Sequence, residues 1–267
     1  MKNIVVYQDI MASTQALLHM LKRRYAHQGV AIIQADGEDV RAHKYPNKDT
    51  IAFFMPGTPS GSSAYREQLQ QDGFDYLVSC VKGGVDFYGI CAGAYLAAEK
   101  FSYKFLQTGE LRKINSPLAI LEGRADGPII ELVHPDRFAA HSGMSAVKIA
   151  FNNVSGKADE TKVFYSTGPA LSVSPKAKGQ YEVLARFNEA AGVPIVALRR
   201  LDLGGTVNVS AFPFEYGDQE YINYIDPQRF LPQSFYDEME KLALYQDARL
   251  RFCDVFLAPI DTKLSLK

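Results

Sequence analysis

In the first third of the chain, short apolar runs alternate with longer stretches whose apolar residues recur at helical spacing. The runs at 4–7, 30–34, 51–55 and 85–90 are rich in β-branched and aromatic residues, which predicts buried strands. Ser13 or Thr14 can cap a first helix that reaches about Gln28, and Gly29 ends it. Further helical stretches are expected over 65–71 and 76–82. Strands that alternate with helices predict an α/β fold, with a mostly parallel central sheet and helices on both faces.

The second half of the chain has a different pattern, with many turn residues and short strand-like runs. The runs lie at 162–165, 181–187, 195–201 and 206–211, and we expect them to extend the same sheet. A loop-rich insertion is predicted from about 109 to 156, and a C-terminal helix from about 234 to 252. No internal repeat or low-complexity linker divides the chain, so a single domain over residues 1–267 is expected.

Charge and cysteine usage narrow the class of protein. The 29 basic and 30 acidic side chains give a formal net charge of −1, which argues against nucleic-acid or membrane-surface partners bound by bulk charge. Three widely spaced cysteines suit neither a disulfide framework nor a zinc site and favour a reducing compartment. The N-terminus lacks the features of a signal peptide, and no run is long enough to span a bilayer. We therefore expect a soluble, cytoplasmic protein, with secretion by a signal-less route left open.

The segment 85–98 carries the strongest functional signal. An apolar strand ends at Gly89, Cys91 follows at a tight bend, and a helix-forming stretch begins at once after it, with Gly93 in its first turn. This is the Gly-x-nucleophile-x-Gly layout of a nucleophile elbow with cysteine in place of serine. A helix N-terminus favours a thiolate, and the N–H of Ala92 is placed to face an oxyanion. The alternative is a buried structural cysteine packed by small neighbours.

A second candidate is the Pro56–Gly57–Thr58 loop, which follows the predicted strand at 51–55. Ligands bind beyond the C-terminal strand ends of parallel sheets, and both this loop and Cys91 lie at such ends. Backbone N–H groups of Gly57 or Thr58, together with those of Ala92 and Gly93, are the predicted oxyanion and ligand-binding donors. The alternative is an ordinary strand-ending turn.

These segments resemble the glutamine-amidotransferase-like domain found at the N-terminus of eukaryotic biotin–protein ligases. The resemblance is carried most specifically by Tyr88–Tyr95 and extends over roughly residues 3 to 220. Supporting segments lie at 55–57, 65, 81–84, 109–111, 123–128, 165–169, 183–187 and 205–216. It implies a class I glutamine amidotransferase-like fold, a flavodoxin-like α/β sandwich. In working members of that superfamily the elbow cysteine attacks an amide carbon, a histidine takes its proton, and an acid orients the histidine.

This sequence departs from that triad. The segment Val209–Tyr216 places Pro213 where the histidine is expected and keeps Glu215 as the acid. Of the five histidines, His141 is the best substitute base, because it lies in a glycine-bearing loop; a solvated loop histidine is the alternative. The catalytic candidates are therefore Cys91, Glu215 and His141. No His or Cys pair has metal-ligand spacing, so no metal or other cofactor is expected.

The leading functional hypothesis is a domain that holds a small ligand against Cys91 and lacks standard glutaminase chemistry. A first alternative is an active cysteine-dependent amidohydrolase or amidotransferase that acts on an amide substrate through a thioester. A second is a non-catalytic interaction protein with a protein partner. The chain has no arginine- and glycine-rich adenylate loop and no Walker A motif, so we expect that it is not a biotin ligase by itself.

Overall fold

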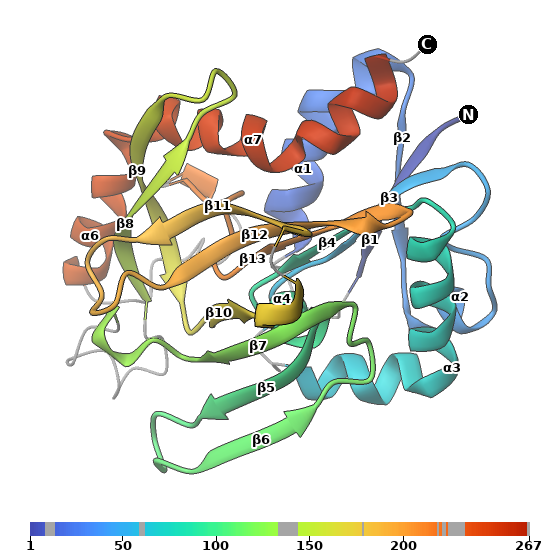
Figure 1. The fold of residues 1–267 in the computed structure, drawn as a ribbon. Helices are drawn as coiled ribbons and strands as arrows, with labels where there is room; N and C mark the ends of the chain where they lie inside the picture. Colours follow the sequence, from blue (N-terminus) through green and yellow to red (C-terminus); the bar gives the residue numbers. More distant parts are fainter. Residues whose placement is uncertain are drawn as a thin grey trace.

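The computed structural model describes residues 1–8, 14–58, 62–132, 144–177, 179–217, 219–220, 223 and 233–265. Within these residues, thirteen strands form one sheet, and helices cover both faces of its parallel half (Figure 1). This is the α/β architecture that the alternating pattern predicts.

The parallel half of the sheet consists of five strands in the order β2-β1-β3-β4-β13. Alternate side chains point to opposite faces, so Ile4 and Val6 enter one hydrophobic core while Val5 and Tyr7 enter the other. The continuous apolar runs are explained by this burial on both faces. The strands are β1 (Asn3–Tyr7), β2 (Ala31–Ala35), β3 (Thr50–Met55), β4 (Asp86–Ile90) and β13 (Gly205–Ser210).

Two groups of helices cover the two faces. Residues of α1 (Thr14–Tyr25) and α7 (Gln246–Ser265) pack in one core, and residues of α2 (Gly37–Arg41), α3 (Ser62–Lys82) and α4 (Ala92–Ala97) pack in the other. The short 3-10 helix η1 (Ala26–Gln28) follows α1, and Gly29 ends it in the left-handed conformation. The two helices expected over 65–71 and 76–82 are one helix with a kink at Gln70, where φ is +53°.

The second half of the chain extends the sheet with mostly antiparallel strands. Its strands are β5 (Ala98–Lys104), β6 (Leu111–Asn115), β7 (Leu121–Gly127), β8 (Met144–Asn152), β9 (Ala158–Ser166), β10 (Ala170–Val173), β11 (Tyr181–Phe187) and β12 (Ile195–Leu203). In the described part of this region, the 3-10 helices η2 (Ile130–Leu132) and η4 (Pro175–Ala177) lie between the strands. The description of 109–156 as loop-rich is therefore wrong, because it contributes β6, β7 and β8. The edge strand β6 is largely exposed and carries Arg112 and Lys113, so it has no apolar run to reveal it.

The C-terminal region also differs from its predicted form. The single helix expected over 234–252 is two helices, α6 (Gln233–Ala243) and α7, and α7 continues to Ser265. No helix among the described residues is both long and apolar enough to cross a membrane.

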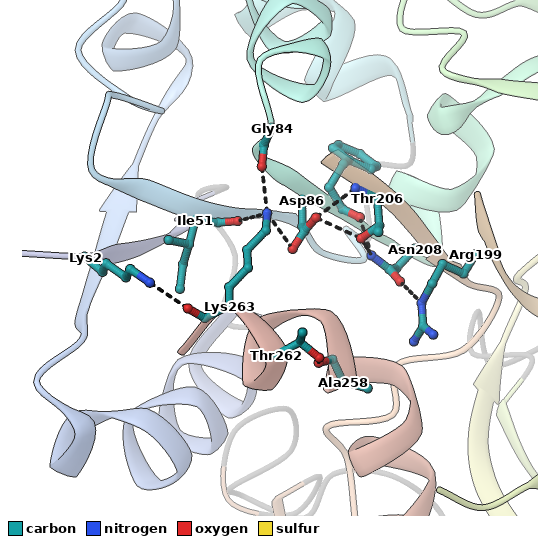
Figure 2. A network of polar contacts seen from close by, with 11 residues as sticks. Lys2, Ile51, Gly84, Asp86, Arg199, Thr206, Asn208, Ala258, Thr262 and Lys263 are labelled. Atoms are coloured by element: carbon teal, nitrogen blue, oxygen red, sulfur yellow. Dashed lines mark hydrogen bonds and ion pairs between the residues drawn. The ribbon is translucent and has the colours of Figure 1, made fainter. Parts of the chain in front are cut away.

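Near its end, α7 is fixed to the sheet by Lys263 (Figure 2). The Lys263 ammonium lies 2.8 Å from the buried carboxylate of Asp86 and donates to the carbonyl oxygens of Ile51 and Gly84. Asp86 also accepts hydrogen bonds from the backbone N–H and the hydroxyl of Thr206. The network joins α7 to β3, β4 and β13 at the N-terminal ends of the last two strands.

Candidate functional site

Cys91 occupies a strained turn between β4 and α4. Its φ and ψ are +51° and −101°, a conformation that residues with a Cβ rarely adopt. Its backbone N–H donates to the carbonyl oxygen of Ser210 on β13 at 2.8 Å, and its own carbonyl accepts from the N–H groups of Ala94 and Tyr95. The turn is therefore held from both sides, by the neighbouring strand and by the first turn of α4.

The two glycines that flank Cys91 are required by close backbone packing. A Cβ on Gly89 would lie 2.7 Å from the carbonyl oxygen of Gly93, and a Cβ on Gly93 would collide with the carbonyl oxygen of Met55. These contacts bring the C-terminal ends of β3 and β4 together. The Gly-x-Cys-x-Gly pattern therefore has a direct physical cause in this packing.

The loop after β3 lies directly against the cysteine. A Cβ on Gly57 would be 3.2 Å from the Cβ and 3.8 Å from the sulfur of Cys91. Tyr65 of α3 donates a hydrogen bond to the carbonyl oxygen of Pro56 at 2.5 Å and so anchors the loop. Thr58 follows in the same loop and is partly buried. The predicted juxtaposition of Gly57 with Cys91 is present in the structure.

A third segment reaches the sulfur, and sequence reasoning did not select it as functional. Ser166 ends β9, and its carbonyl oxygen accepts a hydrogen bond from the Cys91 thiol at 3.5 Å. Tyr95 donates to the carbonyl oxygen of Thr167 at 2.8 Å, and Tyr165 donates to that of Gly168 at 2.7 Å. In the sequence, the Gly-Pro pair at 168–169 indicates only a turn. The contact between Cys91 and Ser166 joins residues that are 75 positions apart, so no local pattern marks it.

The side chain of Cys91 is partly exposed, and its surroundings favour the protonated thiol. Burial among the surrounding groups raises the pKa of the Cys91 thiol to about 12. Glu215, which is ionised at the high pH where this thiol titrates, acts in the same direction. The hydrogen bond from the Ala92 backbone N–H lowers the pKa but is outweighed by burial. Desolvation therefore acts against the thiolate that is expected at this helix N-terminus.

Glu215 is the second unusual group of the site. It is 2% exposed, and one of its carboxyl oxygens, Oε2, has no hydrogen-bond partner among the described residues. Burial raises the pKa of Glu215 to about 8, although the positive charge of Arg249 opposes the change. Glu215 is therefore a neutral carboxylic acid over most of the range below pH 8.

The segment that carries Glu215 leaves the C-terminal end of β13, beside β4. Pro213 and its neighbours in this segment are buried, and Arg249 of α7 holds it by donating to the carbonyl oxygen of Phe214 at 2.7 Å. The structure thus brings Cys91, Ala92, Gly93, Gly57 and Glu215 to one end of the sheet. His141 lies outside the described residues. Within those residues, no three His, Cys, Asp or Glu side chains are close enough to hold a metal ion.

The match to a protein-family model decides the relationship. The model described as "Biotin-protein ligase, N terminal" matches residues 2–266. The chain belongs to this family. The resemblance inferred from the Tyr88–Tyr95 segment is therefore confirmed over nearly the whole chain.

Several known proteins are similar to this member of the biotin–protein ligase N-terminal family. An uncharacterized protein of Chlamydia muridarum (strain MoPn / Nigg) is 26% identical over 209 residues, which cover 76% of this chain and 77% of that protein. A glutamine amidotransferase from Thermotoga maritima superposes with a TM-score of 0.55 at 10% identity, covering 96% of this chain and 98% of that one. A second glutamine amidotransferase gives a TM-score of 0.52 at 18% identity, with coverage of 79% and 90%. At these identities the structures show the fold, which is that of the class I glutamine amidotransferases.

Proposed function

We propose that this member of the family binds a small ligand that bears a carbonyl or carboxylate group against Cys91, and that it lacks ordinary glutaminase activity. The observation that carries the proposal is the state of the sulfur. The thiol hydrogen is bonded to the Ser166 carbonyl, and burial raises the pKa of the Cys91 thiol to about 12. A thiol in this state is a poor nucleophile at neutral pH.

Among the described residues, no base is in place to remove the thiol proton. Among these residues, the Cys91 sulfur interacts with Ser166, Ala92 and Glu215 and with the hydroxyl groups of three tyrosines, Tyr95, Tyr103 and Tyr165. None of these interactions involves a histidine. Pro213 stands where the resemblance to active amidotransferases places the histidine, and its ring has no group that accepts a proton. General-base assistance is worth roughly a hundred- to ten-thousand-fold in rate, so its loss fits a binding role better than rapid turnover.

The groups around the sulfur are better suited to donating hydrogen bonds than to accepting protons. The Ala92 N–H faces the sulfur, and the Gly57 backbone packs against it. Glu215 interacts electrostatically with the sulfur, and its protonated carboxyl group has an O–H that can donate a hydrogen bond. Donors of this kind select a ligand with exposed oxygen lone pairs. We assign Gly57, Thr58, Ala92 and Gly93 to the ligand-binding set.

The decisive measurement is ammonia release from glutamine by the wild-type protein and by Cys91→Ala, together with thermal shifts in glutamine and in acetate. We expect no ammonia release that depends on Cys91, and we expect a stabilising shift that is lost in Gly57→Val, where the added side chain lies over the sulfur. Ammonia release abolished by Cys91→Ala would overturn the binding role. Identical thermal shifts in wild type and Gly57→Val would show that neither compound binds at this site.

One observation favours a second candidate function, an amidohydrolase that acts through a thioester. The strained backbone of Cys91 and the two glycines that flank it support the interpretation of this turn as a nucleophile elbow. In that case Cys91 attacks the amide carbon, the donors at Gly57 and Ala92 hold the oxyanion, and His141 or a substrate group moves the proton. The glutaminase assay distinguishes the two functions.

A further inference from the structure

The loop that follows β9 reaches the Cys91 sulfur, and it is held by hydrogen bonds on both sides of the peptide between Ser166 and Thr167. After Ser166, the Thr167 carbonyl is held by Tyr95 and the Gly168 carbonyl by Tyr165, whose hydroxyl also accepts from the N–H of Ile129. A Cβ on Gly168 would collide with the carbonyl oxygen of Ala211, so Gly168 packs directly against the backbone that follows β13. Upstream, Ser166 is paired within the β8–β9 ladder. The peptide between Ser166 and Thr167 lies between these two anchors.

That peptide is held in an unfavourable orientation. Thr167 has a φ of +58°, in the left-handed region that β-branched residues avoid. Two of the described non-glycine residues with positive φ, Cys91 and Thr167, therefore lie next to the hydrogen bond between the thiol and the Ser166 carbonyl. Rotating this one peptide by half a turn brings φ of residue 167 to a negative value and hardly changes the path of the chain, as in the interconversion of type I and type II turns.

We propose that the Ser166–Thr167 peptide is a two-position switch that sets the reactivity of Cys91. In the position seen here, the Ser166 carbonyl faces the sulfur, accepts the thiol hydrogen and disfavours a thiolate. In the other position the carbonyl turns away, the Thr167 N–H turns toward the sulfur, and a thiolate gains a donor. Thr167 acts as a positioning residue. The strain of its left-handed conformation raises the free energy of the orientation seen here and so reduces the free-energy difference between the two orientations of the peptide.

This inference deepens the proposed function, since it concerns the same sulfur, but its test needs no natural ligand. The rate of Cys91 alkylation by iodoacetamide is measured by peptide mass mapping from pH 6 to pH 11, for wild type, Thr167→Gly and Thr167→Val. Glycine adopts positive φ without strain, so Thr167→Gly stabilises the position seen here. Its alkylation is expected to slow by roughly five- to thirty-fold, with its pH profile displaced upward.

Thr167→Val is the matched control, because it keeps the β-branch and its strain and removes only the hydroxyl, which hydrogen-bonds to Tyr103. Its alkylation rate is expected to equal that of the wild type. Slowing in both variants would assign the effect to the hydroxyl and overturn the switch, and so would a Thr167→Gly rate equal to or above that of the wild type. A failure of ligand binding in the thermal-shift assay would leave these alkylation rates unchanged, so the two proposals fail separately.

Discussion

Replacing Glu215 by glutamine should make this protein more stable, and increasingly so as the pH rises toward 8. Glu215 is 2% exposed, and burial raises its pKa from an ordinary value of 4.5 to about 8. The folded protein therefore holds a proton on Glu215 that the unfolded chain releases above about pH 4.5. Glutamine has nearly the same shape and stays neutral at every pH, so it removes this linkage between protonation and folding.

The magnitude follows from how far the folded-state pKa of Glu215 is raised. A raised pKa contributes stability that is fully present below the unfolded pKa and is lost as the pH rises through the folded pKa. A difference of one between the folded and unfolded pKa values corresponds to about 1.4 kcal/mol, so the stability lost between pH 4.5 and pH 8 is on the order of 5 kcal/mol. At pH 7 roughly two thirds of it is already gone, about 3 kcal/mol, and the Glu215→Gln variant retains it.

The assay is urea unfolding of wild type and Glu215→Gln at closely spaced pH values that span the unfolded and folded pKa of Glu215. The quantity of interest is the difference in unfolding free energy between the two proteins at each pH, because titration of all other groups cancels in it. The exposed Glu67, changed to glutamine in the same way, is the matched control. A buried amide that lacks a partner would displace the whole difference by a constant of about 1–3 kcal/mol but would leave its slope unchanged.

The slope of this stability difference against pH therefore tests whether the pKa of Glu215 is raised in the folded protein. We expect the stability difference to grow by about 1.4 kcal/mol for each pH unit between roughly 5 and 8 and then to level off. A difference that stays flat across this range would show that Glu215 titrates normally and that its carboxyl is solvated or paired. A difference that grows as the pH falls would show that Glu215 is held as a carboxylate, which would restore a working acid to the triad.

Three further outcomes are expected. Lys263→Met should lower the unfolding free energy measured in urea by about 3 kcal/mol, because it leaves the Asp86 carboxylate buried without its cation. Adding Asp86→Asn to the same chain should restore part of the loss, and equal stability of wild type and Lys263→Met would contradict this prediction. Wild-type Cys91 should react with iodoacetamide at about pH 7.5 on the order of a hundred-fold more slowly than free cysteine, with the rate still rising at about pH 10; a plateau near pH 8 would show an activated thiol. Gly168→Ala should lower the stability by about 1–3 kcal/mol, since its methyl group meets the Ala211 carbonyl oxygen; an unchanged melting temperature would show that the loop is free to shift.

Local sequence pattern was sufficient for the parallel half of the fold. The apolar runs at 4–7 and 51–55 became β1 and β3 with nearly the expected limits, because strands buried on both faces need apolar side chains at every position. The tight turn at Cys91 was also predictable, since glycines at 89 and 93 are the residues that permit backbone contacts as close as those found. The polar edge strand β6 and the division of the last helix were not predictable. Both depend on contacts with other elements of the fold, and the local sequence pattern does not show which elements those are.

The chemistry of the site depends on contacts between distant parts of the chain. The Ser166 carbonyl reaches the Cys91 sulfur across 75 residues, and no local signal marks it. The amino-acid sequence supplied a thiol at a helix N-terminus and an acid at 215, and it placed Cys91 and the Pro56–Gly57–Thr58 loop at strand ends. Their protonation is set by burial, which raises the pKa values of Cys91 to about 12 and of Glu215 to about 8. Burial is a property of everything packed around a group, so only the tertiary structure could decide that the pKa values of both groups are raised.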